Sequence, residues 1–404
     1  MNKISLFINN PCNLYFSFWC LYMLQGTLYE SGSLISQGLI FIILYMSIRH
    51  AIILIKRRKK EQYFIALDAL LLLITTYGLL LFVTDGTQLQ SKYVSNPCFY
   101  YLKTYLMSIL PIYSAYYYTQ TGKLTLSLFR RWVFVFVIVA IPVYFLMQRE
   151  LMEAMLMNVN QYDSVTNNSG YLFVALVPCM LVFYRKPIYL WTGITFSALF
   201  VLGSMKRGAI LTAVMGITYI LYKEYYQASK RQKILLLVLL LFIASIFIYY
   251  IESVLMQSDY FYVKLQGTLE GASSGRDNLY LFYWNHYLYD SNIIQQLFGH
   301  GAWGTLKIYE VVAHNDWLEI IINQGLFGVA IFFFYWLSFF KTSKCSRFSP
   351  VSRLSLLCLF LIYFTMTFFS MSIGDMPVFA GTITGFAVAD GFSDNYNNNL
   401  IKVS

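Results

Sequence analysis

Apolar stretches of about 15 to 25 residues, the length of a membrane-spanning helix, recur along the whole chain and limit its fold more than any other feature. Hydrophobic residues make up 58% of the 404 positions and charged residues only 12%, with a mean hydropathy of +0.57. A water-soluble domain of this length carries about 25% charged residues. The sequence therefore predicts an all-α polytopic membrane protein, since a helix satisfies its own backbone polar groups within lipid.

Twelve stretches are apolar enough to be predicted as transmembrane helices. Their approximate centres are Trp19, Leu44, Ile74, Met107, Val139, Val177, Ser197, Gly216, Leu241, Val329, Leu361 and Gly381. The first stretch follows only Lys3 and has no small-residue cleavage site, so we expect a retained span and not a signal peptide. We expect residues 1–404 to form a single transmembrane domain.

The basic residues predict the orientation of these spans. With the N-terminus in the cytoplasm, twenty Lys and Arg residues fall in inner segments and seven in outer segments. Cytoplasmic connections of membrane proteins carry an excess of Lys and Arg, so both termini are predicted to be cytoplasmic. The same pattern explains the net charge of +10 without nucleic acid as a partner.

Several kinds of chemistry lack their motifs in this sequence. The six cysteines are scattered and show no CxxC or Cys/His spacing of the kind that structural zinc needs. No phosphate-binding GxxxxGK[ST] loop and no GxSxG nucleophile motif occurs. One histidine among acids at irregular spacing, at His314 with Glu310, Asp316 and Glu319, is weak support for a metal. We expect neither a metal nor a cofactor.

Residues 252–313 form a long outer segment between the ninth and tenth predicted spans. The stretch "DNLYLFYWNHYLYDSNIIQQL" has the length and aromatic spacing of an amphipathic helix, and "FGHGAWG" supplies glycines for a turn. Long ordered connections often carry function. We therefore predict that this large outer loop is a working part of the protein.

Cationic residues in two outer connections are candidates for binding an anion. Lys206 and Arg207 lie in the short hairpin "GSMKRGAIL" and oppose the positive-inside pattern, although snorkelling at a helix end would also place them there. Arg276 lies in "EGASSGRDNLY", at the predicted start of the aromatic helix, where free backbone N–H groups favour phosphate. A solvated loop arginine is the alternative at this position.

The polar residues that open the tenth span are candidates for catalysis. His314 has the side chain whose ordinary pKa best suits a general base near neutral pH, and Asn315 and Asp316 could bind a sugar hydroxyl or orient the imidazole. The alternative is a polar first turn, because Asn and Asp satisfy free N–H groups at a helix start. The residues alone leave both readings open.

Three motifs together resemble a known superfamily: "SMKRG", "SGRDNLYLFYWNHYL…LFGHGAWG" and "AHNDWLEIIINQGLFGV", in this order. They are similar to the O-antigen polymerase (Wzy-type) and O-antigen ligase superfamily, over about residues 203–329 in motif and over the chain in topology. The resemblance implies a metal-independent glycosyltransferase at the periplasmic face of the bacterial inner membrane. It implies His314 as the base that activates the acceptor hydroxyl, and Arg207 and Arg276 as the residues that hold the diphosphate.

The resemblance also implies the partners: undecaprenyl-diphosphate-linked oligosaccharides as donor and acceptor, membrane lipids and, for a polymerase, a chain-length-determining co-polymerase. The residues expected to bind substrate are Lys206, Lys264, Tyr283, Trp284, Asn315 and Asp316. High Tyr and Phe content and low charge lead us to favour the polymerase. A ligase, which transfers the glycan to lipid A-core, remains the close alternative. A transporter or flippase fits twelve spans but not the long outer loop or the lack of a repeated half.

Overall fold

The structure is a computed structural model that describes residues 10–25, 28–30, 32–56, 61–84, 96–157, 169–204, 206–227, 229–250, 252, 266, 276–374 and 376–393. These residues form helices and connecting turns, with no β-strand among them. Four helices are long and apolar enough to cross a membrane, and four shorter ones are also apolar. The predicted class, a helical membrane protein, is therefore confirmed.

Every predicted span centre falls within a described helix. The twelve helices are α2 (Pro11–Met23), α3 (Leu34–Lys56), α4 (Gln62–Thr84), α5 (Pro97–Gln120), α6 (Leu126–Met157), α7 (Ser169–Cys179), α8 (Pro187–Gly203), α9 (Arg207–Gln227), α10 (Lys230–Tyr250), α15 (Asp316–Ser343), α16 (Pro350–Met366) and α17 (Val378–Val388). The η2 turn (Met180–Phe183) extends α7. Twelve membrane crossings remain a prediction, because some of these helices are short.

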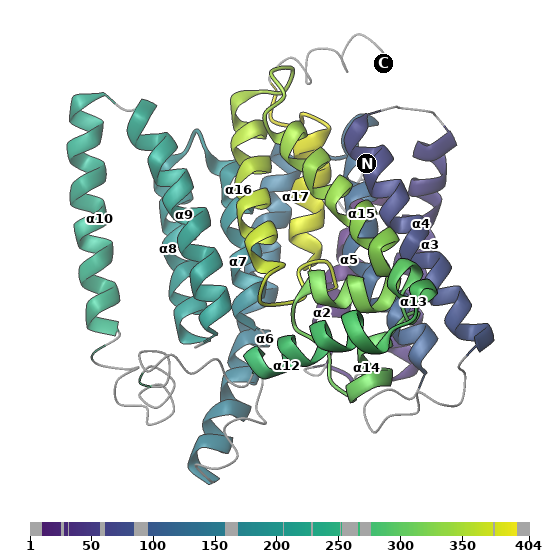
Figure 1. Cartoon of the computed structure of the whole chain (residues 1–404). Helices are drawn as coiled ribbons and strands as arrows, with labels where there is room; N and C mark the ends of the chain where they lie inside the picture. Colours follow the sequence, from purple (N-terminus) through teal and green to yellow (C-terminus); the bar gives the residue numbers. More distant parts are fainter. Residues whose placement is uncertain are drawn as a thin grey trace.

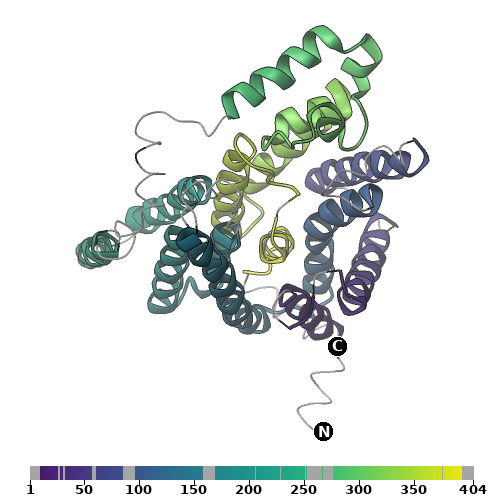
Figure 2. The ribbon, with the colours of Figure 1, turned by 90° about the horizontal axis from the view of Figure 1, so that it is seen from below.

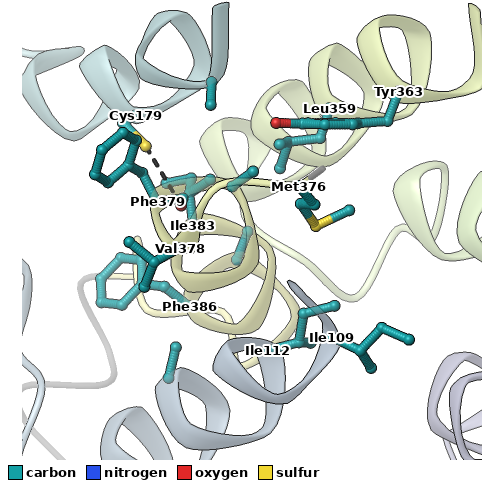
Figure 3. Close-up of a cluster of buried hydrophobic side chains, with 14 of the residues drawn as sticks. Ile109, Ile112, Cys179, Leu359, Tyr363, Met376, Val378, Phe379, Ile383 and Phe386 are labelled. Atoms are coloured by element: carbon teal, nitrogen blue, oxygen red, sulfur yellow. Dashed lines mark hydrogen bonds between the residues drawn. The ribbon is translucent and has the colours of Figure 1, made fainter. Parts of the chain in front are cut away.

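Helix α17 shows how a short helix fits this fold. Its 11 residues are all buried and would measure about 16 Å along the axis, roughly half of a bilayer's hydrocarbon thickness. Seen from one end, α17 lies within the bundle (Figure 2). Its side chains pack with apolar residues of α5, α7 and α16, among them Ile112, Cys179 and Leu359 (Figure 3). Protein, not lipid, therefore surrounds α17.

Two glycines let α17 approach α5 closely. A Cβ atom at Gly385 would lie 2.2 Å from the backbone oxygen of Ile112, and one at Gly381 would lie 2.9 Å from Cβ of Pro111. Small residues four positions apart are the usual means of close helix packing in membranes. The "GTITG" spacing therefore sets the separation of α17 and α5.

The large outer loop is helical over most of its described part. It contains α12 (Arg276–Asn285), the π-helical turn η4 (His286–Asp290), α13 (Ile293–Phe298) and α14 (Gly304–Tyr309). We call residues 276–313 the outer subdomain. It lies at the end of the bundle where α9 and α15 begin, and the α9–α10 and α15–α16 connections lie at the opposite end (Figure 1). The predicted glycine turn is present. The stretch predicted as one aromatic helix is divided in two, because the extended backbone of Ser291 separates η4 from α13.

A kink in α15 receives the glycine turn of the outer subdomain. Gly325 has φ 65° and ψ −163°, which is not helical, so the ladder of backbone hydrogen bonds is interrupted there. The carbonyl groups of Ile322 and Asn323 accept instead from the backbone N–H of His300, at 2.8 Å, and of Gly301, at 3.0 Å. The outer subdomain thus supplies donors to carbonyl groups beside the kink.

Candidate functional site

The polar residues that open α15 hold its first turn against the α16–α17 connection. Asn315 caps the helix: its Oδ1 accepts from the N–H groups of Trp317 and Leu318, and its Nδ2 donates to the carbonyl of Phe368 at 2.9 Å. Asp316 is 3% exposed and accepts from both the N–H and the hydroxyl of Ser372. Asn315 therefore caps the start of the helix, as the alternative interpretation of the sequence predicted. The Asn315 amide and the Asp316 carboxylate both bind other parts of the protein.

Arg276 is held by the same connection. It is the first residue of α12, and its Nη1 donates to the carbonyl of Phe369 at 2.6 Å. Tyr280, one turn later, donates to the carbonyl of His314 at 3.2 Å, and its hydroxyl is within hydrogen-bonding reach of Arg276 and Asn315. Arg276 therefore ties α12 to the α16–α17 connection, and Tyr280 ties α12 to a residue that precedes α15.

Three successive carbonyl groups organise this region. Those of Thr367, Phe368 and Phe369 accept from Asp316 N–H, from Asn315 Nδ2 and from Arg276 Nη1, respectively. Backbone carbonyls occur at every residue, so no sequence pattern could single these three out. Sequence reasoning consequently missed the α16–α17 connection as part of the site.

His314 has an unusual backbone and an exposed side chain. Its φ of +51° lies in the left-handed region, where an L-residue other than glycine is strained by about 1–3 kcal/mol. Surrounding protein atoms and the positive charges of Arg276 and Lys206 lower the pKa of the imidazole to about 4. The ring still reaches solvent. At neutral pH the imidazole is therefore uncharged, and the lowered pKa makes it a weaker base than the ordinary imidazole on which the sequence-based prediction rested.

The short α8–α9 connection brings its cations to this place. Lys206 is close enough for its charge to act on His314, and Arg207, which is exposed, begins α9. A Cβ at the next residue, Gly208, would lie 2.6 Å from the ring of Phe369. The start of α9 therefore packs against the residue whose carbonyl binds Arg276. Lys206, Arg276 and His314 are brought together, and Arg207 follows Lys206 directly.

A pocket of about 450 Å³ lies beside this cluster. It is lined by Tyr280, Leu281, Trp284, Asn315, Trp317, Leu318 and Phe368. Most of these side chains are apolar or aromatic, and the Asn315 amide already caps α15. Trp284, one of the predicted substrate-binding residues, is 44% exposed, so it is accessible to a ligand.

Three other residues predicted to bind substrate are not shown to be accessible to a ligand as Trp284 is. Tyr283 is completely buried, and its hydroxyl donates to the carbonyl groups of Thr305 and Val311, so it stabilises the outer subdomain and cannot stack on a sugar. Asp316 is buried on Ser372, so we assign it a positioning role. Lys264 lies outside the described residues.

Glu319, His286 and His300, at the same end of the molecule, have structural contacts. Glu319 is 1% exposed and accepts from Thr305 Oγ1 at 2.8 Å and from Asn323 Nδ2 at 3.1 Å. His286 Nδ1 lies 3.2 Å from Asp290 Oδ2, and His300 Nε2 lies 2.9 Å from Ser291 Oγ. Within the described ranges, no three His, Cys, Asp or Glu side chains are grouped so that they could hold a metal ion.

A scan against models of protein families finds no match to this chain, and a search of curated proteins finds none either.

Proposed function

We propose that this protein is a metal-independent glycosyltransferase that polymerises undecaprenyl-diphosphate-linked O-antigen repeat units. It would act at the periplasmic face of the bacterial inner membrane, with both of its termini in the cytoplasm. The observation that carries the proposal is the cluster at the start of α15, where a strained, uncharged histidine lies within the electrostatic influence of Lys206 and Arg276. These cations come from two separate connections of the chain.

The cluster suits transfer of a glycan from a lipid diphosphate. In this reaction the bond between the anomeric carbon of the donor and a phosphate oxygen breaks, and a bond from that carbon to an acceptor hydroxyl oxygen forms. Negative charge develops on the departing diphosphate, and Arg276 and Lys206 would stabilise it, with Arg207, the residue after Lys206, as a further candidate. The hydroxyl proton would pass to His314, which is uncharged at neutral pH.

The division of roles follows from the contacts of each residue. Arg276 uses Nη1 on the Phe369 carbonyl and has the Tyr280 hydroxyl within reach, so the remaining N–H groups of its guanidinium would bind the phosphate. Asn315 and Tyr280 hold the backbone around His314 and are positioning residues. The pocket beside the cluster, with Trp284 and Trp317, would take the part of the substrate next to the diphosphate.

A deletion strain carrying plasmid-borne variants tests this function. We expect Arg276→Ala and His314→Asn to reduce long-chain surface polysaccharide by on the order of 100-fold, the usual loss when a transition-state contact is removed. Asn is chosen because it tolerates a positive φ. Lys307→Gln is the matched control, since Lys307 is an exposed cation of the outer subdomain whose Nζ donates to the His300 carbonyl.

The product that accumulates separates the candidate reactions. A single repeat unit attached to lipid A-core in the deletion strain indicates a polymerase, and an unattached lipid-linked polymer indicates a ligase. Wild-type chain length in both the Arg276→Ala and the His314→Asn strain, at normal protein levels, would show that the cluster is not the site of transfer.

A further inference from the structure

The outer subdomain exposes a large apolar surface. Leu281 is 59% exposed on α12, and Ile293 and Ile294 are each 67% exposed on α13. Between Asp277 and Lys307 the sequence contains only one side chain with a full charge, Asp290. Exposed apolar patches of this extent mark surfaces that are covered by a protein or by a membrane. We define the apolar patch as Leu281, Trp284, Leu288, Ile293, Ile294 and Leu297.

The patch continues the surface of helices that are apolar enough to cross the membrane. The ring of Phe298, at the end of α13, lies 6.1 Å from that of Phe327 in α15, which is itself 52% exposed. The hydroxyl of Tyr77 in α4 donates to the Phe298 carbonyl at 2.5 Å. Just beyond Tyr77, α4 exposes Leu79 and Leu80. The end of α13 therefore packs beside the exposed apolar surfaces of α4 and α15.

The axis of α12 runs roughly parallel to the plane that a membrane around the bundle would have. When the bundle is viewed along its helices, α12 is seen from the side and lies beyond the edge of the bundle (Figure 2). It therefore runs across the axes of the spanning helices, at the end of the bundle where α15 begins (Figure 1). Trp284 and Tyr289, which are 44% and 79% exposed, are the residue types that favour the boundary between acyl chains and headgroups.

We propose that α12 and α13 lie in the outer interface of the lipid bilayer, with the apolar patch inserted among the acyl chains. The occupant of this surface is lipid and not a second protein, because the patch is continuous with the apolar surfaces of α4 and α15. Leu281 and Trp284 also line the 450 Å³ pocket, so the pocket lies at the lipid boundary. This inference is independent of the reaction that the protein catalyses.

Nitroxide labels on single cysteines in lipid nanodiscs test the proposal. Labels at Ile294→Cys and Leu281→Cys are compared with a control at Asn278→Cys, an exposed polar position of α12. The background replaces Cys98 and Cys345 by Ser, because the other four cysteines are buried. We expect oxygen, which concentrates in lipid, to relax the two patch labels several-fold more than it relaxes the control. A water-soluble nickel chelate should relax the control more.

Two results would overturn the proposal. Equal access of the nickel chelate to Ile294→Cys and Asn278→Cys would place the patch in water. Poor access of both reagents to the patch labels would mean that protein covers it, from a partner or from this chain. Ile293→Cys repeats the measurement on the neighbouring residue if the Ile294 variant elutes as an aggregate.

Discussion

At the scale of single residues, Asn315 and Asp316 make structural contacts at the start of α15, and the neighbouring His314 is the candidate for chemistry. Asn315 and Asp316 satisfy backbone N–H groups and bind the α16–α17 connection. Their contacts fix the chain on one side of His314, and Tyr280 holds its carbonyl. A left-handed backbone at a non-glycine residue persists only where its surroundings enforce it, and such strain is concentrated at functional sites. The exposed imidazole is the part of this segment that remains open to a substrate.

The lowered pKa of His314 predicts an unusual pH dependence. Desolvation and the charges of Arg276 and Lys206 disfavour the protonated ring, so its pKa is about 4 instead of 6.5. A base is lost as pH falls through its pKa, so the proposed glycosyl transfer should persist to well below pH 6. Lys206→Gln removes one of the positive charges that lower the pKa of His314, so this pKa should rise. The acid limb of the pH–rate profile, where the rate falls because His314 is protonated, should therefore move to higher pH.

Polymerisation rates in proteoliposomes between pH 4 and pH 8 measure this limb. Lys307→Gln should leave the acid limb in place, because the charges that lower the pKa of His314 are those of Arg276 and Lys206. An unchanged acid limb in Lys206→Gln would show that another group accepts the proton.

Tyr283 gives a second prediction at the residue scale. Its hydroxyl donates to the carbonyl groups of Thr305 and Val311 in a fully buried position. Tyr283→Phe leaves these carbonyls without that donor, at a cost of about 1–3 kcal/mol. We expect a lower melting temperature and faster proteolysis within residues 276–313, with an unchanged KM for the lipid-linked substrate. A raised KM at wild-type stability would restore the substrate-binding role that the sequence suggested.

At the scale of elements, the kink of α15 and the glycine turn form one joint. Gly325 has a backbone conformation that is open almost only to glycine, and a Cβ there would lie 2.5 Å from the backbone of Leu297. Gly325→Ala should therefore destabilise the protein by more than the roughly 1–3 kcal/mol of backbone strain alone. Thermal unfolding in detergent measures the effect.

Gly301→Ala is the matched control for this joint. Gly301 also has a positive φ, of +90°, but a Cβ there would meet only Lys307 Nζ, at 3.4 Å. It should therefore show the strain without the collision. Equal melting temperatures for the two variants would mean that the contact of Gly325 with α13 is not needed.

The sequence predicted helices better than it predicted contacts. Hydropathy places the interior of each apolar helix, because lipid and protein interiors both exclude charge, and "FGHGAWG" indicated a turn through its glycines. The approach of Lys206 and Arg276 to His314 depends on how separate connections meet, which no local pattern specifies. Burial of Tyr283 and exposure of Trp284 likewise depend on which face of α12 meets α15.

At the scale of the whole molecule, the chain is asymmetric between its two ends. Lys and Arg lie in the α15–α16 connection and in the helix ends that flank the α9–α10 connection, and the outer subdomain with the candidate site lies at the other end (Figure 1). Arg347 pairs with Glu61 at 3.3 Å, which links the α15–α16 connection to the start of α4. If the positive-inside rule sets the orientation, the candidate site faces away from the cytoplasm.

Labelling of single cysteines in spheroplasts tests this orientation directly. A membrane-impermeant maleimide should label Asn278→Cys in intact spheroplasts, because α12 would be external. It should label Ser346→Cys, an exposed position between α15 and α16, only after the membrane is permeabilised. The background again lacks Cys98 and Cys345, so that Cys345 does not report in place of Ser346→Cys. The reverse pattern would invert the protein and place the His314 cluster in the cytoplasm. Labelling of both positions from outside would mean that α15 does not cross the membrane, and a lipid-diphosphate site at its start would then lose its structural basis.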